Sequence, residues 1–311
     1  MKPKTSRIVV SAVALFLTIA ADQPQQAAAC EECQLRKEGT YLGQFTLMGN
    51  GTVRSFVTYG KNGKPSSLGV TFSESALSGL PEKLPASMPM WEYALSLPPE
   101  ARVTGFDHIS LDWSPQGHEP NGIYTKPHFD VHFYLTSRAE RKKITFQGVD
   151  KVAGARRPAA RFLPAGYVLP PGTAIPNMGA HAIDAAAPEL TGKGFTHTFV
   201  YGYYKGQVNF MEPMVTKAFL ETKPNVTIPV KQPTAYFARG YYPTSYSMKY
   251  DAVRQEYTVS LDGLTLREAL RRSTPSSPTA HKTSLDNQQP TFHKRGKASQ
   301  RATQATRTQA K

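Results

Sequence analysis

Hydrophobic and polar residues alternate along several stretches of the chain, most clearly over residues 128–134, HFDVHFY. There, phenylalanine and valine alternate with two histidines and one aspartate. A period of two predicts a strand with one buried face. We therefore expect the aromatic and valine side chains to enter the core and His128, Asp130 and His132 to project to the other side.

Other stretches show the same pattern next to residues that favour turns. Residues 106–113, FDHISLDW, alternate as a strand, with His108, Ser110 and Asp112 on one face. GNG at 49–51 and KNGK at 61–64 predict hairpins, because Asn-Gly pairs suit tight turns.

A further hairpin is expected around KGQ at 205–207, with its tip at Lys205 and Gly206. Regular pairing from that tip sets Phe199 opposite Glu212. His197 and Glu212 would then be diagonal neighbours on one face.

Short helices are expected at a few places. The chain contains 25 prolines, 23 glycines, 15 tyrosines and 15 phenylalanines, a composition that favours β-structure. We predict a mainly β, antiparallel fold, barrel- or sandwich-like, with a few short helices. The expected helical stretches are residues 73–85, 91–98, 137–146 (charged and facing solvent) and 216–222.

The two ends of the chain differ in composition from the middle. Residues 1–29 have basic residues, an apolar run and small residues, the order of a cleaved export signal. Residues 30–37 form a linker with Cys30 and Cys33 in a CxxC, for which a local disulfide is favoured. Residues 38–270 form the β-rich domain, and residues 271–311 a disordered basic tail. The protein is thus expected in the periplasm or outside the cell, with lipidation at Cys30 less favoured.

The formal net charge of +14 is spread along the chain and includes the leader and the tail. No aromatic and arginine run typical of a nucleic-acid platform occurs, so no specific nucleic-acid partner is expected. Contact with a membrane would require lipidation at Cys30 or the basic tail.

Histidines and carboxylates provide the candidate chemistry. Imidazole and carboxylate are common metal ligands, and a set that leaves one position open could activate water. A regular strand holds its i and i+4 residues roughly 13 Å apart, so two histidines at this spacing cannot join one compact site. Either one of them pairs with the aspartate and other segments complete the shell, or a bulge bends the strand. The predicted ligands of a divalent ion (Zn, Fe, Mn or Cu) are His118, His128, Asp130, His132 and His181, with Glu119, His197 and Glu212 as outer partners.

Two alternatives stay open. The same side chains could hydrogen-bond one another as a structural network. The protein would then be a non-catalytic, self-assembling envelope or stress-response protein, for which a homo-oligomer is expected. A module that binds a ligand through the tyrosines of residues 240–250 is the third reading. No GxSxG and no phosphate-binding glycine loop is present, so whether the protein is an enzyme stays open.

Long motifs resemble a bacterial family of exported proteins of unknown function, whose structurally known representative is a small Thermus protein. The motifs are GHEP (117–120), PHFDVHFY (127–134), THTFVYG (196–202) and EPMVT (212–216). The resemblance spans roughly residues 40–220. It implies a β-rich fold and self-assembly through strands or tyrosine surfaces.

Overall fold

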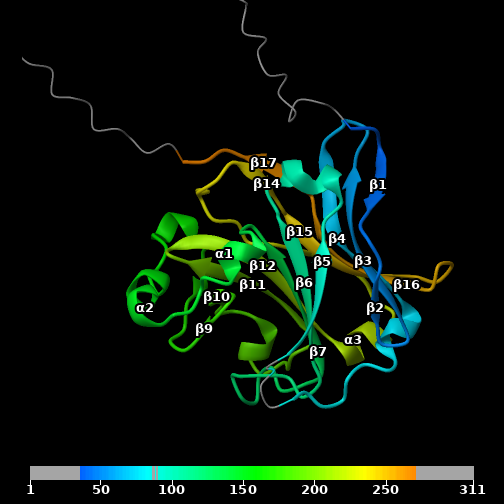
Figure 1. Ribbon diagram of the computed structural model, residues 1–311, viewed down its shortest axis with the longest axis horizontal. Helices are drawn as coiled ribbons and strands as arrows, with labels where there is room; N and C mark the ends of the chain where they lie inside the picture. The colour runs from blue at the N-terminus through cyan, green and yellow to red at the C-terminus, as the bar shows by residue number, and fades with distance from the viewer. Residues whose placement is uncertain (1–35, 86–87, 89, 271–311) are drawn as a thin grey trace, which may run out of the picture. The chain divides into compact units, whose positions relative to one another are not determined.

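The computed structural model describes residues 36–85, 88 and 90–270 of the chain. In these residues two antiparallel sheets carry most of the secondary structure (Figure 1). The expected export signal, the CxxC and the basic tail lie outside the described residues. No helix within the described ranges is both long and apolar enough to cross a membrane.

The first sheet is formed by both ends of the described chain. In it, the N-terminal hairpins pair with strands from the C-terminal part of the described chain, as the blue and orange ribbons show in Figure 1. In spatial order it contains β1 (Gly39–Leu42), β3 (Gly51–Tyr59), β4 (Pro65–Ser73), β16 (Glu256–Asp262), β15 (Ser245–Asp251) and β13 (Asn225–Pro229), with β2 (Thr46–Met48) paired to β3.

The second sheet uses the central part of the chain. Its strands, in spatial order, are β5 (Trp91–Ser96), β6 (His108–Ser114), β7 (His128–Tyr134), β12 (Gln207–Thr216), β11 (His197–Tyr204), β10 (Gly179–Asp184) and β8 (Tyr167–Val168), with β9 (Ala174–Ile175) paired to β10.

Short helices and a small ribbon complete the fold. The ribbon pairs β14 (Gly240–Tyr242) with β17 (Thr265–Arg267). The α-helices are α1 (Arg138–Arg141), α2 (Gly148–Gly154) and α3 (Lys217–Glu221), and the 3₁₀ helices are η2 (Glu74–Leu77), η3 (Pro99–Thr104), η4 (Ala160–Phe162) and η5 (Pro188–Leu190).

The main hydrophobic core lies between the two sheets. It combines residues of the first sheet, such as Leu68 and Val259, with the inward residues Phe129, Val131 and Phe133 of β7. Within the described residues, the strand order of each sheet runs between two free edges. The expected β-rich antiparallel fold is therefore confirmed as a sandwich, and the barrel alternative is wrong.

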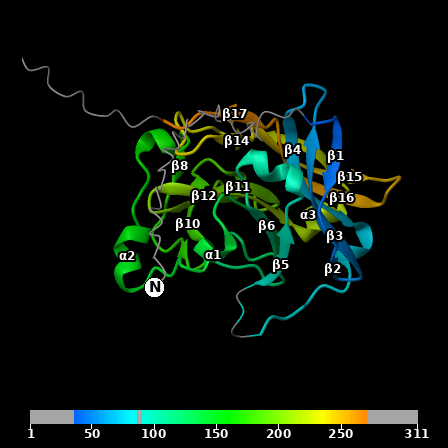
Figure 2. The same cartoon turned by 45° about the horizontal axis from the view of Figure 1, so that its top comes forward.

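The outer face of the second sheet is polar and yet buried. Alternation along β6 and β7 places histidine, serine and aspartate on this face, and all residues of both strands are buried. Loops and α1 cover it, and the turned view shows α1 in front of this sheet (Figure 2). Two small apolar clusters pack on the same face, around Tyr124 and Phe195 and around Tyr134 and Phe210. The candidate site lies between these clusters.

Two local expectations are corrected. Residues 91–96 form strand β5 instead of a helix, because Tyr93 and Leu95 alternate into the core against β6. The helix at 137–146 is limited to α1, and Arg141 turns inward instead of facing solvent. It makes a bidentate ion pair with Glu92, with its Nη1 2.8 Å from Oε1.

The hairpin at Lys205 and Gly206 is present, but its register differs from the expected one. A shift between Gly202 and Tyr203 moves the pairing by one residue, so Val200 lies opposite Glu212. A slip of one residue exchanges the two faces of a strand. His197 therefore lies on the opposite face of the sheet from Glu212.

Candidate metal centre

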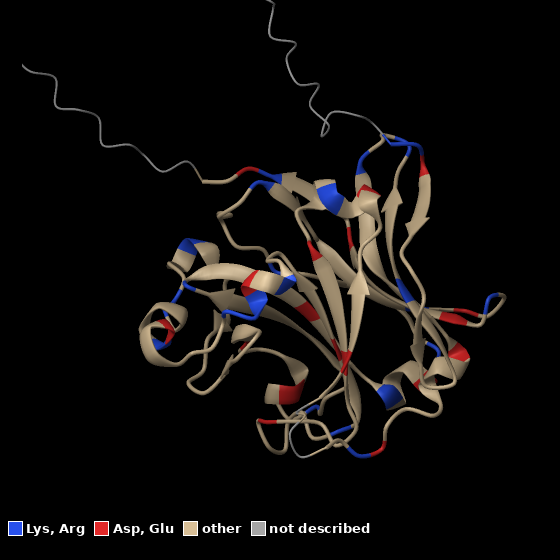
Figure 3. Ribbon diagram, viewed as in Figure 1, with Lys and Arg blue, Asp and Glu red and all other residues tan. Residues whose placement is uncertain are grey.

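The register of the second sheet brings its polar side chains together. In antiparallel pairs, Ser110 lies opposite His132, and Asp112 lies opposite Asp130. On the other side of β7, Asp130 pairs with Met214. Residues directly opposite each other share a face, so β6, β7 and β12 deliver their polar residues to one place. Acidic residues, in red, accordingly lie along the middle of this sheet (Figure 3).

One group consists of His118, His128 and Asp130. The loop between β6 and β7 carries His118, whose Nε2 lies 3.3 Å from Asp130 Oδ2. His128 Nε2 lies 3.0 Å from the other oxygen, Oδ1. One potential ligand atom from each residue lies within 4.8 Å of the others. His128 and Asp130 are buried, whereas the side chain of His118 is 32% exposed and connects the group to solvent.

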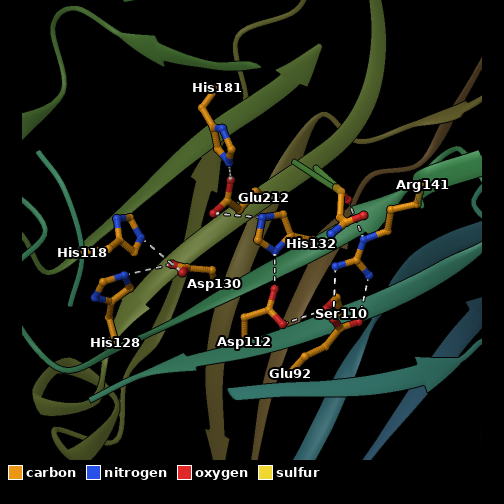
Figure 4. Close-up of polar contacts among 11 residues, drawn as sticks. Glu92, Ser110, Asp112, His118, His128, Asp130, His132, Arg141, His181 and Glu212 are labelled. Carbon is orange, nitrogen blue, oxygen red and sulfur yellow. Dashed lines mark hydrogen bonds and ion pairs between the residues drawn. The ribbon is translucent and has the colours of Figure 1, made fainter. Parts of the chain in front are cut away.

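A second group consists of His132, His181 and Glu212, from β7, β10 and β12. His132 Nε2 lies 3.5 Å from Glu212 Oε1, and His181 Nε2 lies 3.7 Å from Oε2. Their potential ligand atoms also lie within 4.8 Å of one another. Figure 4 shows both groups side by side, with the two carboxylates between the four imidazoles.

Gly202 provides the space in which the second group assembles. It is the residue of β11 opposite His181, and a Cβ placed there would lie 2.0 Å from Phe210 Cε1. Without a side chain at this position, the Phe210 ring packs against both His132 and His181, at 4.8 and 5.1 Å between ring centroids.

All four imidazoles have the same orientation. Nδ1 of His118, His128 and His181 lies 2.6, 2.6 and 2.8 Å from the carbonyl oxygen of Glu119, Lys126 and Thr173, respectively. A carbonyl can only accept, so Nδ1 carries the proton and, in the neutral ring, Nε2 has a lone pair. Each Nε2 points to a carboxylate of the site.

The fourth imidazole, that of His132, has a carboxylate beside Nδ1 as an ion-pair partner instead of a carbonyl oxygen. Asp112 Oδ2 lies 2.9 Å from His132 Nδ1, and Asp112 Oδ1 accepts a hydrogen bond of 2.7 Å from Ser110 Oγ. A carboxylate behind a histidine fixes the ring orientation and increases its basicity as a ligand. His132 Nε2 is thereby directed to Glu212.

Burial and charge act against each other on these groups. Burial lowers the pKa of His118, but contact with Asp130 outweighs it and raises this pKa to about 9. Burial likewise lowers the pKa of His132, and Glu212 and Asp112 together raise it to about 8. The pKa of Glu212 is raised to about 7, chiefly by burial. For His181, burial and the neighbouring His132 lower the pKa to about 4.

The two groups fit divalent metal ions. His128 Nε2, Asp130 Oδ1 and Glu212 Oε2 are buried and make no aligned hydrogen bond in the described part of the chain. Ligand bonds of about 2.0–2.1 Å place two atoms of one octahedral or tetrahedral ion about 2.9 to 3.4 Å apart. The imidazole–carboxylate separations of 3.0 to 3.7 Å lie within or just above this range, and one ligand atom from each residue of a group lies within 4.8 Å of the others. Each group offers two imidazoles and one carboxylate, a set that suits zinc, iron(II) and related ions.

The structure brings together all five predicted ligands, but in two groups. His128 joins Asp130 and a histidine from the preceding loop, which is the first of the two expected arrangements, whereas His132 belongs to the neighbouring group. Glu119 contributes only its carbonyl oxygen, and its residue is exposed. His197 is not part of the site, because the register shift turns it toward Phe219 and Tyr246.

Sequence reasoning missed two roles. Glu212 was expected outside the ligand set, but its carboxylate belongs to the second group. Asp112 was expected on the polar face of its strand but was given no role. Pairing the alternating stretches 106–113 and 128–134 as neighbours would have placed Asp112 beside His132.

Comparison with known proteins supports a link to a family of unknown function. Residues 60–113 match the family model TTHB210-like, described as hypothetical protein TTHB210. This stretch contains Asp112 but none of the six residues of the two groups. Neither the curated proteins nor the solved structures that were searched gave a match.

Proposed function

We propose that this protein binds divalent transition-metal ions, one at each of the two groups. The observation that carries the proposal is the shared orientation of the imidazoles, which turn a lone pair of Nε2 toward a carboxylate oxygen. Two lone pairs at 3.0 Å repel each other unless a proton or a cation lies between them. A metal ion meets this requirement without protonating buried imidazoles.

The arrangement also suits reactivity at the metal. Three protein ligands leave a coordination position for water or substrate, and a bound ion would supply Lewis acidity and lower the pKa of that water. Side chains of His118 and His181 are 32% and 18% exposed, so the two groups are accessible from solvent. Asp112 would keep His132 in its ligand tautomer throughout.

Metal analysis of the purified full-length chain tests the proposal. After chelation and reconstitution with zinc, iron(II), manganese or copper, we expect two ions per chain. His118→Ala and His181→Ala should each leave one ion. His197→Ala is the matched control, because this histidine lies on the other face of the sheet, and it should retain two. Metal-free protein of full stability with each of the four ions would overturn the proposal and favour the structural reading of the histidines.

We also propose that the protein acts outside the cytoplasm. The support is the sequence of residues 1–29, with basic residues, an apolar run and small residues in that order. Mass spectrometry of protein from the native cell envelope should find a chain shortened by about this leader. An intact N-terminus on cytoplasmic protein would contradict it.

A further inference from the structure

A separate hollow lies beside α1 on the outer side of the second sheet. Its volume is about 660 Å³, which lies within the range of small-molecule sites. Residues of β5, of α1 and of the turn after β9 line it. None of the six metal-group residues is among them.

Part of the lining is apolar and open to solvent. Met88, Trp91 and Ile175 are 41%, 37% and 37% exposed, and all three line the hollow, with Ile175 coming from a distant part of the chain. Large apolar side chains that gather at one exposed place mark a binding surface more often than single ones do. Methionines in the lining can adapt to different ligand shapes.

The other part of the lining is cationic. Arg138, Arg141 and Lys142 line the hollow together with one carboxylate, Glu92. Glu92 is occupied by Arg141, whereas Arg138 and Lys142 have no ion pair with any described residue. Two positive charges therefore stay unbalanced beside the apolar surface.

Arg141 gives the hollow a buried cationic group that is held in a fixed position. Its residue is only 8% exposed, and its guanidinium lies 4.4 Å from the Tyr134 ring centroid. Nε donates to the Asn177 carbonyl oxygen, and Nη1 and Nη2 donate to Glu92 (Figure 4). Three of its five N–H groups are thus used, and two remain on a rigidly held guanidinium that lines the hollow.

We propose that this hollow binds a small amphipathic carboxylate, such as a medium-chain fatty acid. The apolar chain would lie against Trp91 and Ile175, and the carboxylate would meet Arg138, Lys142 and the free donors of Arg141. Charge complementarity and the apolar lining select this class over neutral amphiphiles and over inorganic anions.

The hollow lies next to the second metal group but shares no residue with it. Met178 lines the hollow and packs with Tyr134 and Phe210, and Phe210 in turn packs on His132 and His181. A polar connection runs beside this apolar layer, because Ser110 Oγ, which donates to Asp112 Oδ1, lies next to Glu92 of the hollow (Figure 4). Decanoate binding is therefore measured on protein of one defined metal content.

Trp91 provides the readout. The chain has two tryptophans, and the other, Trp113, is buried in the main core as the cross-strand partner of Trp91, so the Trp91→Phe variant is needed to assign the signal. Titration of the full-length protein with decanoate should change the fluorescence of Trp91 and saturate, and Trp91→Phe should abolish the change. We expect 1-decanol to bind at least tenfold more weakly, because it lacks the charge that the basic residues recognise.

Substitutions of the basic lining residues test whether their charge binds the carboxylate. Arg138→Ala combined with Lys142→Ala should weaken decanoate binding at least tenfold. The matched control is Lys61→Ala, an exposed lysine in a turn of the other sheet, and it should leave binding unchanged. Equal affinity for decanoate and decanol, or an unaltered affinity in the double variant, would overturn the proposal. So would the absence of any fluorescence change with decanoate.

Discussion

Asp130→Asn is the sharpest test of how metal binding and stability are linked. Asparagine keeps the size of the side chain but removes the charge shared by His118 and His128. The second group, formed by Glu212 and its two histidines, is unchanged, so the variant alters only the first group. If the groups bind metal separately, the variant loses one of two increments of stabilisation.

The expected magnitude follows from linkage. A ligand present at 100 times its Kd stabilises the folded state by about 2.7 kcal/mol per site, so two sites give about 5.4 kcal/mol. Replacing an outer partner of a metal costs 10–100-fold in affinity, and we expect at least about 100-fold for a ligand. At the same metal concentration the altered site would then contribute only about 0.4 kcal/mol, for a sum of about 3.1 kcal/mol.

Thermal unfolding of metal-free and metal-loaded protein measures the difference. At roughly 2–4 °C per kcal/mol for a domain of this size, metal should raise the Tm of the wild type by about 11–22 °C and that of the variant by about 6–12 °C. The control is Asp262→Asn on β16, whose carboxylate accepts hydrogen bonds from serines of the first sheet. It should lower the Tm but keep the full metal-dependent rise. The same rise in Asp130→Asn as in the wild type would refute the reasoning.

Four further predictions concern the second group and the effect of pH. Asp112→Asn should weaken metal binding at that group about 10–100-fold, because it releases the ring of His132, and a competition titration with a chelator measures this. Gly202→Ala should destabilise the protein by about 1–3 kcal/mol in urea unfolding, because its methyl group would overlap the Phe210 ring. The pKa values of His118 and His132 are raised to about 9 and about 8, so metal must displace protons, and calorimetry in several buffers should show affinity rising from pH 6 to pH 9. In metal-free protein, protonation of these two histidines stabilises the fold below pH 6.5, and unfolding should show this stabilisation being lost as pH rises through 8 and 9.

The sequence predicted the faces of residues 106–113 and 128–134 but not the partners of these residues on neighbouring strands. Alternation in residues 128–134 placed the histidines and the aspartate outside the core, because side-chain direction depends only on the local period. Which group each histidine joins depends on the register with β12 and on the loop that carries His118. Neither has a signal within the strand itself.

A register shift of one residue in the β11–β12 hairpin determines which side chains of β11 share a face with Glu212. Counting from the turn at Lys205 and Gly206 assumes regular pairing, whereas the irregularity next to Gly202 inserts a shift of one residue. From Gly202 toward the start of β11, each side chain therefore shares a face with the neighbour of the β12 residue that regular pairing would have given it. The hairpin could be predicted from its turn residues, but which side chains of β11 and β12 share a face could not.

The polar face of the second sheet is costly unless cations occupy it. Three buried carboxylates, on Asp112, Asp130 and Glu212, lie among imidazoles, and Nδ1 of His118, His128 and His181 already donates to a backbone carbonyl oxygen. Burying a charge without a partner costs several kcal/mol, so metal-free protein must take up protons at Nε2 or on a carboxylate. The raised pKa values of His118, His132 and Glu212 express that demand. A divalent ion in each group would satisfy it in one step, and because the groups join β7, β10, β12 and a loop, metal binding would also hold the cover of the sheet in place.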